Sequence, residues 1–281
     1  MRMNEAVQPF KASVIISIYN NVETLRCVLD SLKMQSEQNF EIIISEDAEH
    51  QSVAEFCGSY PFVHSYQHLT QSDCGWQKNR ALNRAIKAAQ SDYLIFVDGD
   101  CVLHPRFVEF HLGLASERGV VAGKRVKLNS ELSDLLMSDL SSYKEIEKRL
   151  LKMVAFGGKR GCGFVEEGIF IDPKSLFGFV PSLRKMQNLK GCNMSFSKRA
   201  IYDINGFDED YTRPAIGEDI DLVWRFRTAG YRLVSARNLA VQYHIYHKEN
   251  WSDQSENIEM MERKQATNSY FCKNGLDPQT I

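Results

Sequence analysis

Residues 93–101 read YLIFVDGDC, a short apolar run that ends abruptly in two aspartates on either side of a glycine. An apolar strand that delivers Asp98 and Asp100 at its carboxyl end suits a metal-diphosphate site, because two carboxylates can hold a hard divalent cation against phosphate oxygens. The alternative interpretation is a solvated turn after a strand. The sequence around the triplet has to distinguish the two.

Similar apolar runs on both sides of this stretch predict the fold class. β-branched, apolar segments lie at residues 13–18, 40–44, 62–66, 93–97 and 120–122, and each is expected to be a strand. Two stripes with i, i+3, i+4, i+7 spacing predict helices between them. The stripes consist of Leu25, Val28, Leu29 and Leu32, and of Leu82, Ala85, Ile86 and Ala89. Continuously apolar strands separated by helices indicate an α/β fold with a mostly parallel sheet covered on both faces.

Polar side chains follow three of these predicted strands at their carboxyl ends, where parallel sheets bind ligands. They are Ser17, Tyr19 and Asn20 after the first strand, Glu46 and Asp47 after the second, and Asp98 and Asp100 after the fourth. Asn20 and Glu23 also have the spacing of a capping box at the start of the first helix. Polar residues follow strands in many proteins, but three coincident sites favour one shared crevice.

Composition narrows the class of protein. The chain has 281 residues, 43% of them hydrophobic, which is typical of a water-soluble globular protein with a large core. Its 34 basic and 36 acidic side chains give no overall basic field, which argues against a nucleic-acid partner. No run has the length of a membrane span and the first ten residues lack a signal-peptide core, so a cytoplasmic location is expected. The seven cysteines show no C-x-x-C pairing, and most are expected to be buried hydrophobes.

Taken together with two segments further on, these residues resemble the inverting family 2 glycosyltransferases of the GT-A fold. The matching pieces are SVIISIYNN (13–21), FEIIISEDA (40–48), ALNRAIKAA (81–89), SDYLIFVDGDC (91–101), KGCNMSFSKRAIYDINGFDEDY (190–211) and GEDIDLVWRF (217–226). The last two resemble the carboxyl half of β-galactosyl- and N-acetylgalactosaminyltransferases and of bacterial capsule polymerases. The resemblance implies a GT-A fold, with a Rossmann-like, mostly parallel twisted sheet flanked by helices.

The resemblance implies a binding site for a UDP-sugar. Ser17 and Tyr19 fall where this family cradles the nucleoside, and Asp47 falls where a carboxylate accepts the N3 proton of uracil. The family more often has proline at the position of Ser17 and aspartate at that of Glu46. The other donor-site residues that it implies are Asp98, Gly99, Asn193 and, toward the diphosphate, Arg80 or Lys78.

A metal site is implied in the same way. Asp100 would coordinate Mn²⁺ or Mg²⁺ directly, while Asp98 reaches the ribose or a metal-bound water. GT-A enzymes often add a histidine from the carboxyl end, and AVQYHIYHKENW (240–251) offers His244 and His247. His244 is favoured because it ends an apolar run.

The GEDIDL motif carries the implied acceptor site. Asp219 matches the catalytic base of the family, Glu218 can hydrogen-bond acceptor hydroxyls, and Gly217 permits close approach of backbone and sugar. The structural alternative is that both carboxylates only complement a helix dipole in its first turn.

The remainder of this motif predicts a helix. Asp221 and Arg225 lie four residues apart and are expected to form an ion pair on it. Trp224 is either a core residue or an acceptor-stacking platform.

Four segments are expected along the chain. Residues 10–125 form the nucleotide-sugar-binding half, 126–190 a variable insertion or mobile acceptor loop, 191–250 the acceptor-binding and catalytic half of the same domain, and 251–281 a helical tail. The insertion is rich in cations, namely Lys144, Lys148, Arg149, Lys152, Lys159 and Arg160. These either form a solvated helix face or meet an anionic acceptor or membrane surface.

The sequence thus predicts a metal-dependent inverting glycosyltransferase. It would move a hexose or N-acetylhexosamine, with a galactose-type sugar favoured, from UDP to a saccharide or lipid-linked saccharide in bacterial lipopolysaccharide or capsule synthesis. The expected location is the cytoplasm or the inner face of the cytoplasmic membrane, with the oligomeric state left open. Two alternatives stay open: a catalytically silent sugar-nucleotide- or glycan-binding subunit, and a nucleotidyltransferase, whose glycine-rich basic signature SVIISIYNN lacks.

Overall fold

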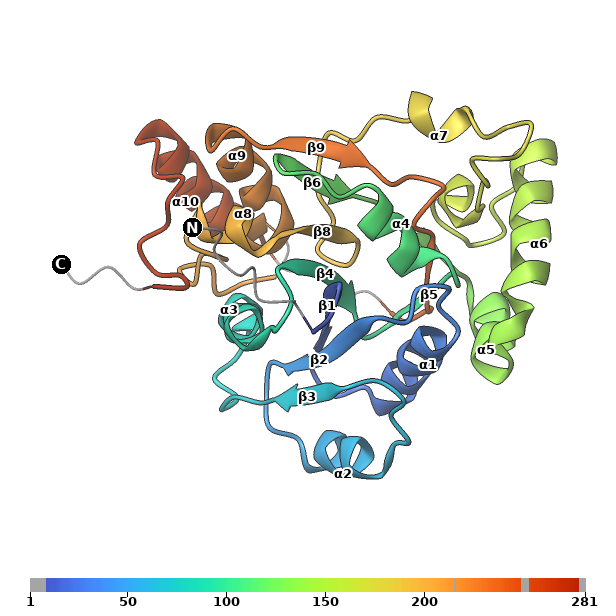
Figure 1. Ribbon diagram of the computed structural model, residues 1–281, viewed down its shortest axis with the longest axis horizontal. Helices are drawn as coiled ribbons and strands as arrows, with labels where there is room; N and C mark the ends of the chain where they lie inside the picture. Colours follow the sequence, from blue (N-terminus) through green and yellow to red (C-terminus); the bar gives the residue numbers. More distant parts are fainter. Residues whose placement is uncertain (1–8, 215, 249–252, 278–281) are drawn as a thin grey trace, which may run out of the picture.

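A seven-stranded sheet forms the centre of the computed structural model, which describes residues 9–214, 216–248 and 253–277 (Figure 1). The strand order is β3-β2-β1-β4-β8-β6-β9. The strands are β1 (Ala12–Ile18), β2 (Phe40–Glu46), β3 (Tyr66–Leu69), β4 (Tyr93–Asp98), β6 (Gly119–Ala122), β8 (Met194–Ser197) and β9 (Arg232–Ser235). Neighbouring strands are parallel except at β8, which runs antiparallel to β4 and β6. The predicted α/β class with a mostly parallel sheet is confirmed.

The register of this sheet brings the carboxyl ends of β1, β2 and β4 together. Ser17 lies opposite Ser45 of β2 and opposite Asp98 of β4. The amide of Gly99 then donates to the carbonyl oxygen of Ser17 at 2.8 Å, which continues the pairing beyond the strand. A Cβ atom at Gly99 would lie 3.2 Å from that oxygen, so the close approach of the two strand ends favours glycine.

Four of the five predicted strands are confirmed to within two residues, and the prediction for residues 62–66 is wrong. The rings of Phe62 and Tyr66 stack at a centroid distance of 3.6 Å, and Phe62 packs against the core. This run is therefore apolar because of aromatic packing. Pairing with β2 begins only at Ser65, whose carbonyl oxygen accepts from the amide of Ile42.

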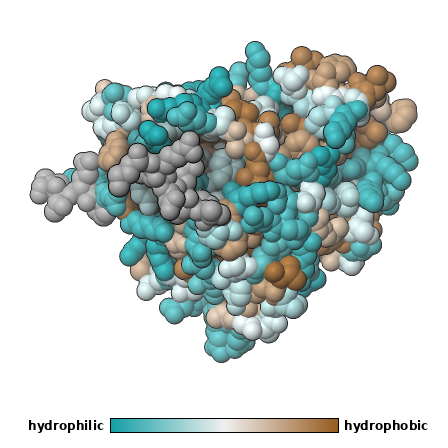
Figure 2. All heavy atoms as spheres, in the orientation of Figure 1, coloured by the Kyte–Doolittle hydropathy of each residue, from teal (hydrophilic) through white to brown (hydrophobic). Residues whose placement is uncertain are grey.

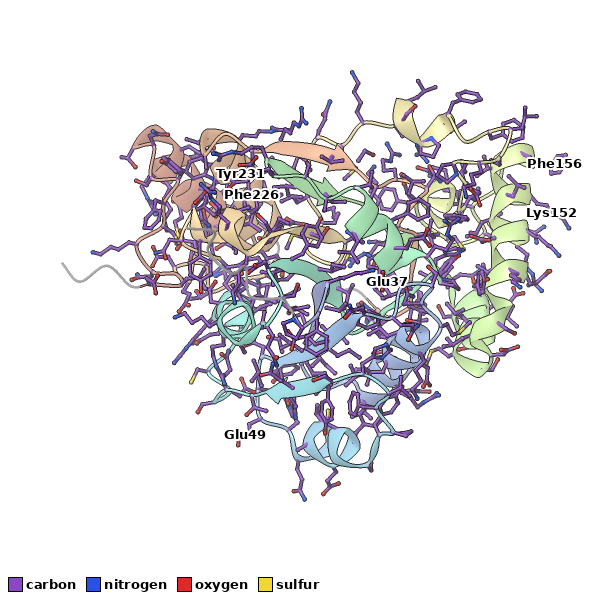
Figure 3. The ribbon with its side chains drawn as sticks, in the orientation of Figure 1. Glu37, Glu49, Lys152, Phe156, Phe226 and Tyr231 are labelled. Carbon is purple, nitrogen blue, oxygen red and sulfur yellow. The ribbon has the colours of Figure 1, made fainter. Side chains whose placement is uncertain are left out.

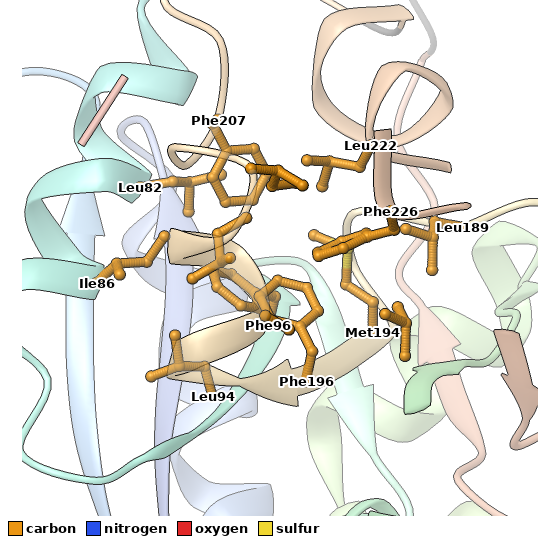
Figure 4. Packing of buried hydrophobic residues seen from close by; sticks show 14 of the residues in the cluster. Leu82, Ile86, Leu94, Phe96, Leu189, Met194, Phe196, Phe207, Leu222 and Phe226 are labelled. Carbon is orange, nitrogen blue, oxygen red and sulfur yellow. The ribbon is translucent and has the colours of Figure 1, made fainter. Parts of the chain in front are cut away.

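Helices cover both faces of the sheet. One face packs against α1 (Val22–Lys33), α2 (Gln51–Ser59) and α4 (Phe107–Gly113), and the other against α3 (Lys78–Ala88), α8 (Lys198–Tyr202) and α9 (Asp221–Thr228). Figure 4 shows the second face, where Phe96 and Phe196 of the sheet lie between Leu82 of α3 and Phe226 of α9. The ring centroids of Phe196 lie 5.0 Å from those of Phe96 and Phe226. This packing fixes α9 against the sheet.

The predicted capping box is wrong by one residue. Asn21 is the N-cap of α1, and its side chain accepts from the amide of Thr24 at 3.1 Å. Asn20 is instead an exposed residue of the loop that precedes the helix.

A small second sheet lies beside the first and carries the segment 126–190. It consists of β5 (Cys101–Leu103), β10 (Gln242–His244) and β7 (Val126–Lys127), in that order. The segment itself forms α5 (Ser130–Ser138), α6 (Tyr143–Phe156) and α7 (Val180–Leu183), with 3-10 turns at Leu140–Ser142 and Val165–Gly168. Leu132, Ile146 and Leu150 of its helices bury against Val102 and Tyr243 of the small sheet. The segment therefore has its own hydrophobic cluster, at the right of Figure 1.

Helix α10 (Ser255–Ala266) follows the last strand and is held by ion pairs of Lys264 with Asp208 and Asp210. Of the predicted helical tail 251–281, residues 251, 252 and 278–281 lie outside the described residues. Within the part of the chain that is described, no helix combines the length and apolar character needed to cross a membrane. All seven cysteines are free thiols and only Cys74 is exposed, as the cysteine pattern predicts.

Candidate active site

A cleft of about 820 Å³ opens at the carboxyl ends of β1, β2 and β4. Residues after three different strands line it together: Ser17, Tyr19 and Asn20, then Asp47, then Asp98, Gly99 and Asp100. Its other walls include Asn21, Thr24, Asp73, Gly75, Trp76, Lys78, Pro214, Glu218, Ile245, Tyr246 and His247. Glu46 was also predicted to line this crevice but does not. It is fully buried and pairs with His50 and His68 at 2.9 and 2.7 Å.

Asp47 lines the cleft and is held by two hydrogen bonds. Its carboxylate accepts from the Gln77 amide at 2.9 Å and from the Gln71 side chain at 2.7 Å. Burial raises the pKa of Asp47, although these two donors oppose the shift. The exposed ring of Tyr19 lines the same cleft and is anchored by a 2.7 Å hydrogen bond from its hydroxyl to Asp73. A fixed acceptor and a fixed aromatic ring in one cleft suit a planar base with an N–H group.

Lys78 occupies the middle of the cleft, between two carboxylates. Its ammonium lies 2.9 Å from Asp98 Oδ1 and 2.8 Å from Glu218 Oε2. Burial opposes its charge, but the two carboxylates outweigh burial and hold the pKa of Lys78 well above its usual value. Arg125 contacts the other oxygen of Asp98 at 3.2 Å. Asp98 is therefore directed at two cations, whereas the sequence interpretation had it sharing the metal with Asp100.

Asp100 lies at the mouth of the cleft with two histidines. Its Oδ2 atom is 3.4 Å from His244 Nε2 and 3.2 Å from His247 Nε2, and the two ring nitrogens are 3.2 Å apart. The pairing of β10 with β5 places His244 opposite Cys101, which brings the ring beside Asp100. Partial burial opposes ionisation, but hydrogen bonds with His244 and His247 outweigh it and hold the pKa of Asp100 well below its usual range.

The three converging atoms of this cluster fit a divalent cation. One carboxylate oxygen and two imidazole nitrogens all lie within 4.8 Å of one another. Mg²⁺ takes oxygen ligands almost exclusively, whereas the two imidazole nitrogens of this set suit a first-row transition-metal ion. The sequence left open whether His244 or His247 would be the metal ligand, and both rings lie at this cluster.

Glu218 and Asp219 lie on a π-helical turn, Ile216–Ile220, that leads into α9. Burial raises the pKa of both carboxyl groups, and Lys78 beside Glu218 and Lys190 beside Asp219 oppose the shift. The ammonium of Lys190 lies 3.4 Å from Asp219 Oδ2. Two adjacent carboxylates therefore face different directions, Glu218 into the cleft and Asp219 toward Lys190.

A buried ion pair anchors this turn from the helix side. Arg225 Nη1 lies 3.0 Å from Asp221 Oδ2, with both side chains almost completely buried, so the predicted pair is confirmed. The Tyr211 hydroxyl and the Trp224 indole also donate to Asp221, at 3.0 and 2.9 Å. The Trp224 side chain therefore supports the buried ion pair, and it is not among the residues that line the cleft.

Asp219 and His244 are not among the residues that line the cleft, although Glu218 and Asp100 beside them are. Three further residues predicted for the site do not line it either. The sequence left open whether Arg80 or Lys78 would face the diphosphate. Arg80 is exposed and donates to Gln77, whereas Lys78 lines the cleft. Asn193 is fully buried. Its side-chain nitrogen donates to the Lys124 and Ala240 carbonyl oxygens, and its side-chain oxygen is hydrogen-bonded to the His111 ring. Gly217 packs against Tyr211, whose Cβ would lie 2.3 Å from an added Cβ atom.

Arg125, Asp73 and Lys190 belong to the site but were missed in the sequence. Arg125 follows β6 at its carboxyl end, so the rule that singled out Asp47 and Asp98 applies to it equally. Lys190 precedes the GCNM segment, and only its contact with Asp219, 29 residues away, reveals its place.

Comparison with known families and proteins gives consistent results. Residues 13–170 match the family model described as glycosyl transferase family 2, and residues 183–248 match one described as the N-terminal domain of galactosyltransferase. The chain is 23% identical over 245 residues to chondroitin synthase of Escherichia coli, covering 83% of this chain and 34% of that protein. It is 27% identical over 235 residues to the amylovoran biosynthesis glycosyltransferase AmsB of Erwinia amylovora, covering 83% of this chain and 69% of that protein. The chain thus spans about a third of the length of chondroitin synthase.

Solved structures share the fold. Staphylococcus aureus TarS in complex with UDP-GlcNAc matches with a TM-score of 0.58 and 14% identity, over 92% of this chain and 66% of the other. The mannosyltransferase PcManGT of Pyrobaculum calidifontis, in complex with GDP-Man and Mn²⁺, matches with a TM-score of 0.54 and 16% identity, over 96% of this chain and 66% of the other. At these identities the likeness concerns the fold alone.

Proposed function

The chain belongs to glycosyltransferase family 2, with a GT-A fold, and from this premise we propose that it transfers a sugar from UDP to a saccharide acceptor with inversion. The sugar is a hexose or N-acetylhexosamine, with a galactose-type sugar favoured, and the acceptor belongs to a bacterial surface glycan such as lipopolysaccharide or capsule. The observation that carries this proposal is the cleft itself. Its lining includes Asp47, whose carboxylate accepts two hydrogen bonds, together with Asp100 and His247 of the cluster that His244 completes.

The donor would occupy the cleft, with its base at Asp47 and its diphosphate at the Asp100, His244 and His247 cluster. Asp47 accepts the N–H group of uracil, Tyr19 and Ser17 enclose the nucleoside, and Lys78 meets the diphosphate. Asp100, His244 and His247 would hold the divalent cation, Mn²⁺ or Mg²⁺, which would offset the negative charge that develops on the diphosphate as UDP leaves. The Lys78 ammonium has three N–H donors and contacts two carboxylates, so a third donor is left for a phosphate oxygen. A phosphate oxygen that also replaced Glu218 would leave this carboxylate available for acceptor hydroxyls.

Asp219 acts as the general base in this proposal. It takes the proton from the acceptor hydroxyl while that oxygen attacks the anomeric carbon on the face opposite UDP. Burial in a turn anchored by the Asp221 and Arg225 pair fixes its position, and positioning supplies much of the rate acceleration.

A nucleotide panel tests the donor class. We expect UDP and dTDP, whose bases both carry an N3–H group, to raise the melting temperature in the presence of Mn²⁺ more than GDP and CMP do, because ligand binding to the native state stabilises it. Equal stabilisation by all four nucleotides would contradict the role of Asp47.

A product assay separates the alternatives. A transferase releases UDP from one UDP-sugar, a nucleotidyltransferase forms or consumes diphosphate, and a silent subunit binds UDP without turning over any donor. The absence of UDP release across a broad panel of UDP-sugars and saccharides would favour the silent subunit.

The proposed location of the protein is the cytoplasm, in peripheral contact with the inner face of the membrane. An exposed apolar patch supports this: Phe156 is 87% exposed, Leu176 85% and Leu183 69%, and Phe177 and Phe179 are also exposed. Figure 2 shows this patch as brown spheres over α7 and the end of α6, and Figure 3 shows Phe156 and Lys152 directed outward from α6. Residues 143–190 contain ten basic and five acidic side chains, in a chain that is acidic overall. Apolar side chains beside excess positive charge suit an anionic lipid surface.

Vesicle sedimentation tests this contact. The protein is expected to sediment with vesicles that contain phosphatidylglycerol, and a Phe156→Ser, Leu176→Ser double variant to sediment much less. Val63→Ser serves as the control, because Val63 is 69% exposed and lies outside the patch. Equal sedimentation of all three proteins would contradict the membrane contact.

A further inference from the structure

A second cavity, of about 530 Å³, lies beside the cleft and is strongly basic. Six of its eleven lining residues are cations and, among the residues that the structure describes, none of the eleven is acidic. The cations are Lys124, Arg125, Lys127, Lys185, Lys190 and Arg237. The chain as a whole carries two more acidic than basic side chains, so this concentration of positive charge is local.

Several of these cations share their carboxylate partners. Glu167 lies buried behind the cavity and is shared by three of the surrounding cations: Arg237 at 3.0 Å, Arg184 at 3.1 Å and Lys124 at 3.8 Å. Asp98 is likewise shared, between Arg125 and Lys78. Each of these carboxylates therefore meets more than one positive charge. Unbalanced like charges repel one another, and an anionic ligand would relieve this repulsion.

Lys185 adds a charge that the protein itself leaves uncompensated. Its ammonium group has no hydrogen bond or ion pair with any of the described residues, yet the side chain lines the cavity. Lys185 is exposed as well as lining the cavity, so its charge is accessible to an anionic ligand that enters.

The cavity adjoins the candidate base. Lys190 lines it and also lies 3.4 Å from Asp219 Oδ2, and Arg125 connects it to Asp98 in the cleft. An acceptor whose hydroxyl is placed at Asp219 can therefore extend into the cavity while the nucleotide occupies the cleft.

Phe164 gives the cavity an apolar wall of the kind that sugar rings contact. Its side chain is 50% exposed although it lines the cavity, and its backbone has a φ of 55°, which a non-glycine residue rarely adopts. A strained residue that keeps an aromatic ring half exposed is typical of a binding site.

We propose that this cavity binds an anionic group of the acceptor, a carboxylate or a phosphate, so that the protein prefers acidic acceptors over neutral ones. The inference rests on the proposed sugar transfer and names the acceptor class for it. Two sources share this chemistry, namely a uronic acid within the saccharide and the diphosphate of a lipid-linked saccharide.

Two pairs of acceptors distinguish the sources in a transfer assay with the wild-type protein. The first pair is a glucuronate-terminated oligosaccharide and its methyl ester, and the second is a sugar on a short isoprenoid diphosphate and the same sugar on a neutral alkyl chain. The charged member of at least one pair is expected to have a KM at least about tenfold lower, in keeping with hydrogen bonds to charged groups. Whichever pair shows this difference identifies the source, and added salt should reduce it.

Variants locate the effect in the cavity. Lys185→Gln and Lys124→Gln are expected to raise the KM of the charged acceptor several-fold, with less effect on its neutral partner. Lys87→Gln is the control, since Lys87 is an exposed cation on α3 that lines neither the cleft nor the cavity. The inference is overturned if the wild-type protein uses charged and neutral members of both pairs with equal KM. It is also overturned if the cavity variants behave as Lys87→Gln does.

Release of UDP from the donor in the absence of acceptor separates this result from failure of the proposed function. If the protein hydrolyses a UDP-sugar but shows no preference for charge, only the acceptor inference fails. If no donor is turned over under any condition, the sugar transfer itself is refuted and the acceptor inference with it.

Discussion

Replacing Arg225 by methionine is expected to lower the free energy of unfolding by about 3–5 kcal/mol, the usual cost of removing one partner of a buried ion pair. The guanidinium lies 3.0 Å from Asp221, and the two side chains are 1% and 0% exposed. It also donates to the carbonyl oxygens of Ile204, Gly206 and Tyr270. The variant would leave a buried carboxylate and three buried carbonyl groups without this donor.

The expected loss lies toward the lower end of that range. Asp221 keeps its hydrogen bonds from Tyr211 and Trp224, which continue to stabilise its charge after the guanidinium is gone. At roughly 2–4 °C per kcal/mol for a protein of about this size, a loss of about 3 kcal/mol corresponds to a fall in melting temperature of about 6–12 °C. The transfer rate should fall as well, because Asp219 lies two residues before the helix that Asp221 begins.

Thermal unfolding followed by circular dichroism measures this effect, with Arg227→Met as the matched control. Arg227 lies on the same helix but is exposed, and it donates one hydrogen bond to the Gln187 carbonyl oxygen at 2.8 Å. We expect the control to melt within about 2 °C of the wild type, since surface substitutions usually change stability by less than about 0.5 kcal/mol. Equal melting temperatures for Arg225→Met and Arg227→Met would refute the reasoning.

Four further predictions concern the site and the turn that carries it. Asp219→Asn should lower kcat about 10²- to 10⁴-fold, the usual contribution of a general base, and steady-state transfer at saturating donor measures this. Because burial raises the pKa of Asp219 and the base must be ionised, the wild-type rate should fall on acidification at a pH above the value of about 3.9 for a free aspartate; a pH-rate profile that stays flat to pH 4 would contradict this. Asp100→Asn should abolish the additional thermal stabilisation that Mn²⁺ gives with UDP, and a wild-type shift in this variant would exclude Asp100 as a ligand. Gly217→Ala should destabilise the fold by about 1–3 kcal/mol in urea unfolding, because its Cβ would overlap Tyr211, whereas Gly58→Ala has open space and should not; equal stability of the two variants would contradict the close packing.

The central strands were predictable because their burial is nearly complete. Strands β1 and β2 are buried along almost their whole length, so their apolar runs carry a clear signal. Strand β8 was not predicted, because Met194 to Ser197 is only four residues long and alternates with serine. Its antiparallel insertion between β4 and β6 is set by tertiary packing of Met194 and Phe196, which short-range patterns do not contain.

The site was predictable to the extent that it depends on strand ends. Asp47 and Asp100 meet in one cleft because the sheet register forces them together. The partner of each polar side chain was not predictable, because it comes from distant segments. Asp98 pairs with Lys78 and Arg125, and the side-chain nitrogen of Asn193 donates to two backbone carbonyl oxygens. Residue type and spacing gave no sign of either outcome.

The measurement that tests the central claim most directly is UDP release from a panel of UDP-sugars, with Mn²⁺ and with a chelator, by the wild-type protein and by Asp100→Asn. The account predicts that one UDP-sugar is turned over fastest with Mn²⁺, that chelation removes most of this activity, and that Asp100→Asn lacks it even with Mn²⁺. Turnover that is equal with metal, with chelator and in the variant would contradict a metal-assisted transfer at the Asp100, His244 and His247 cluster.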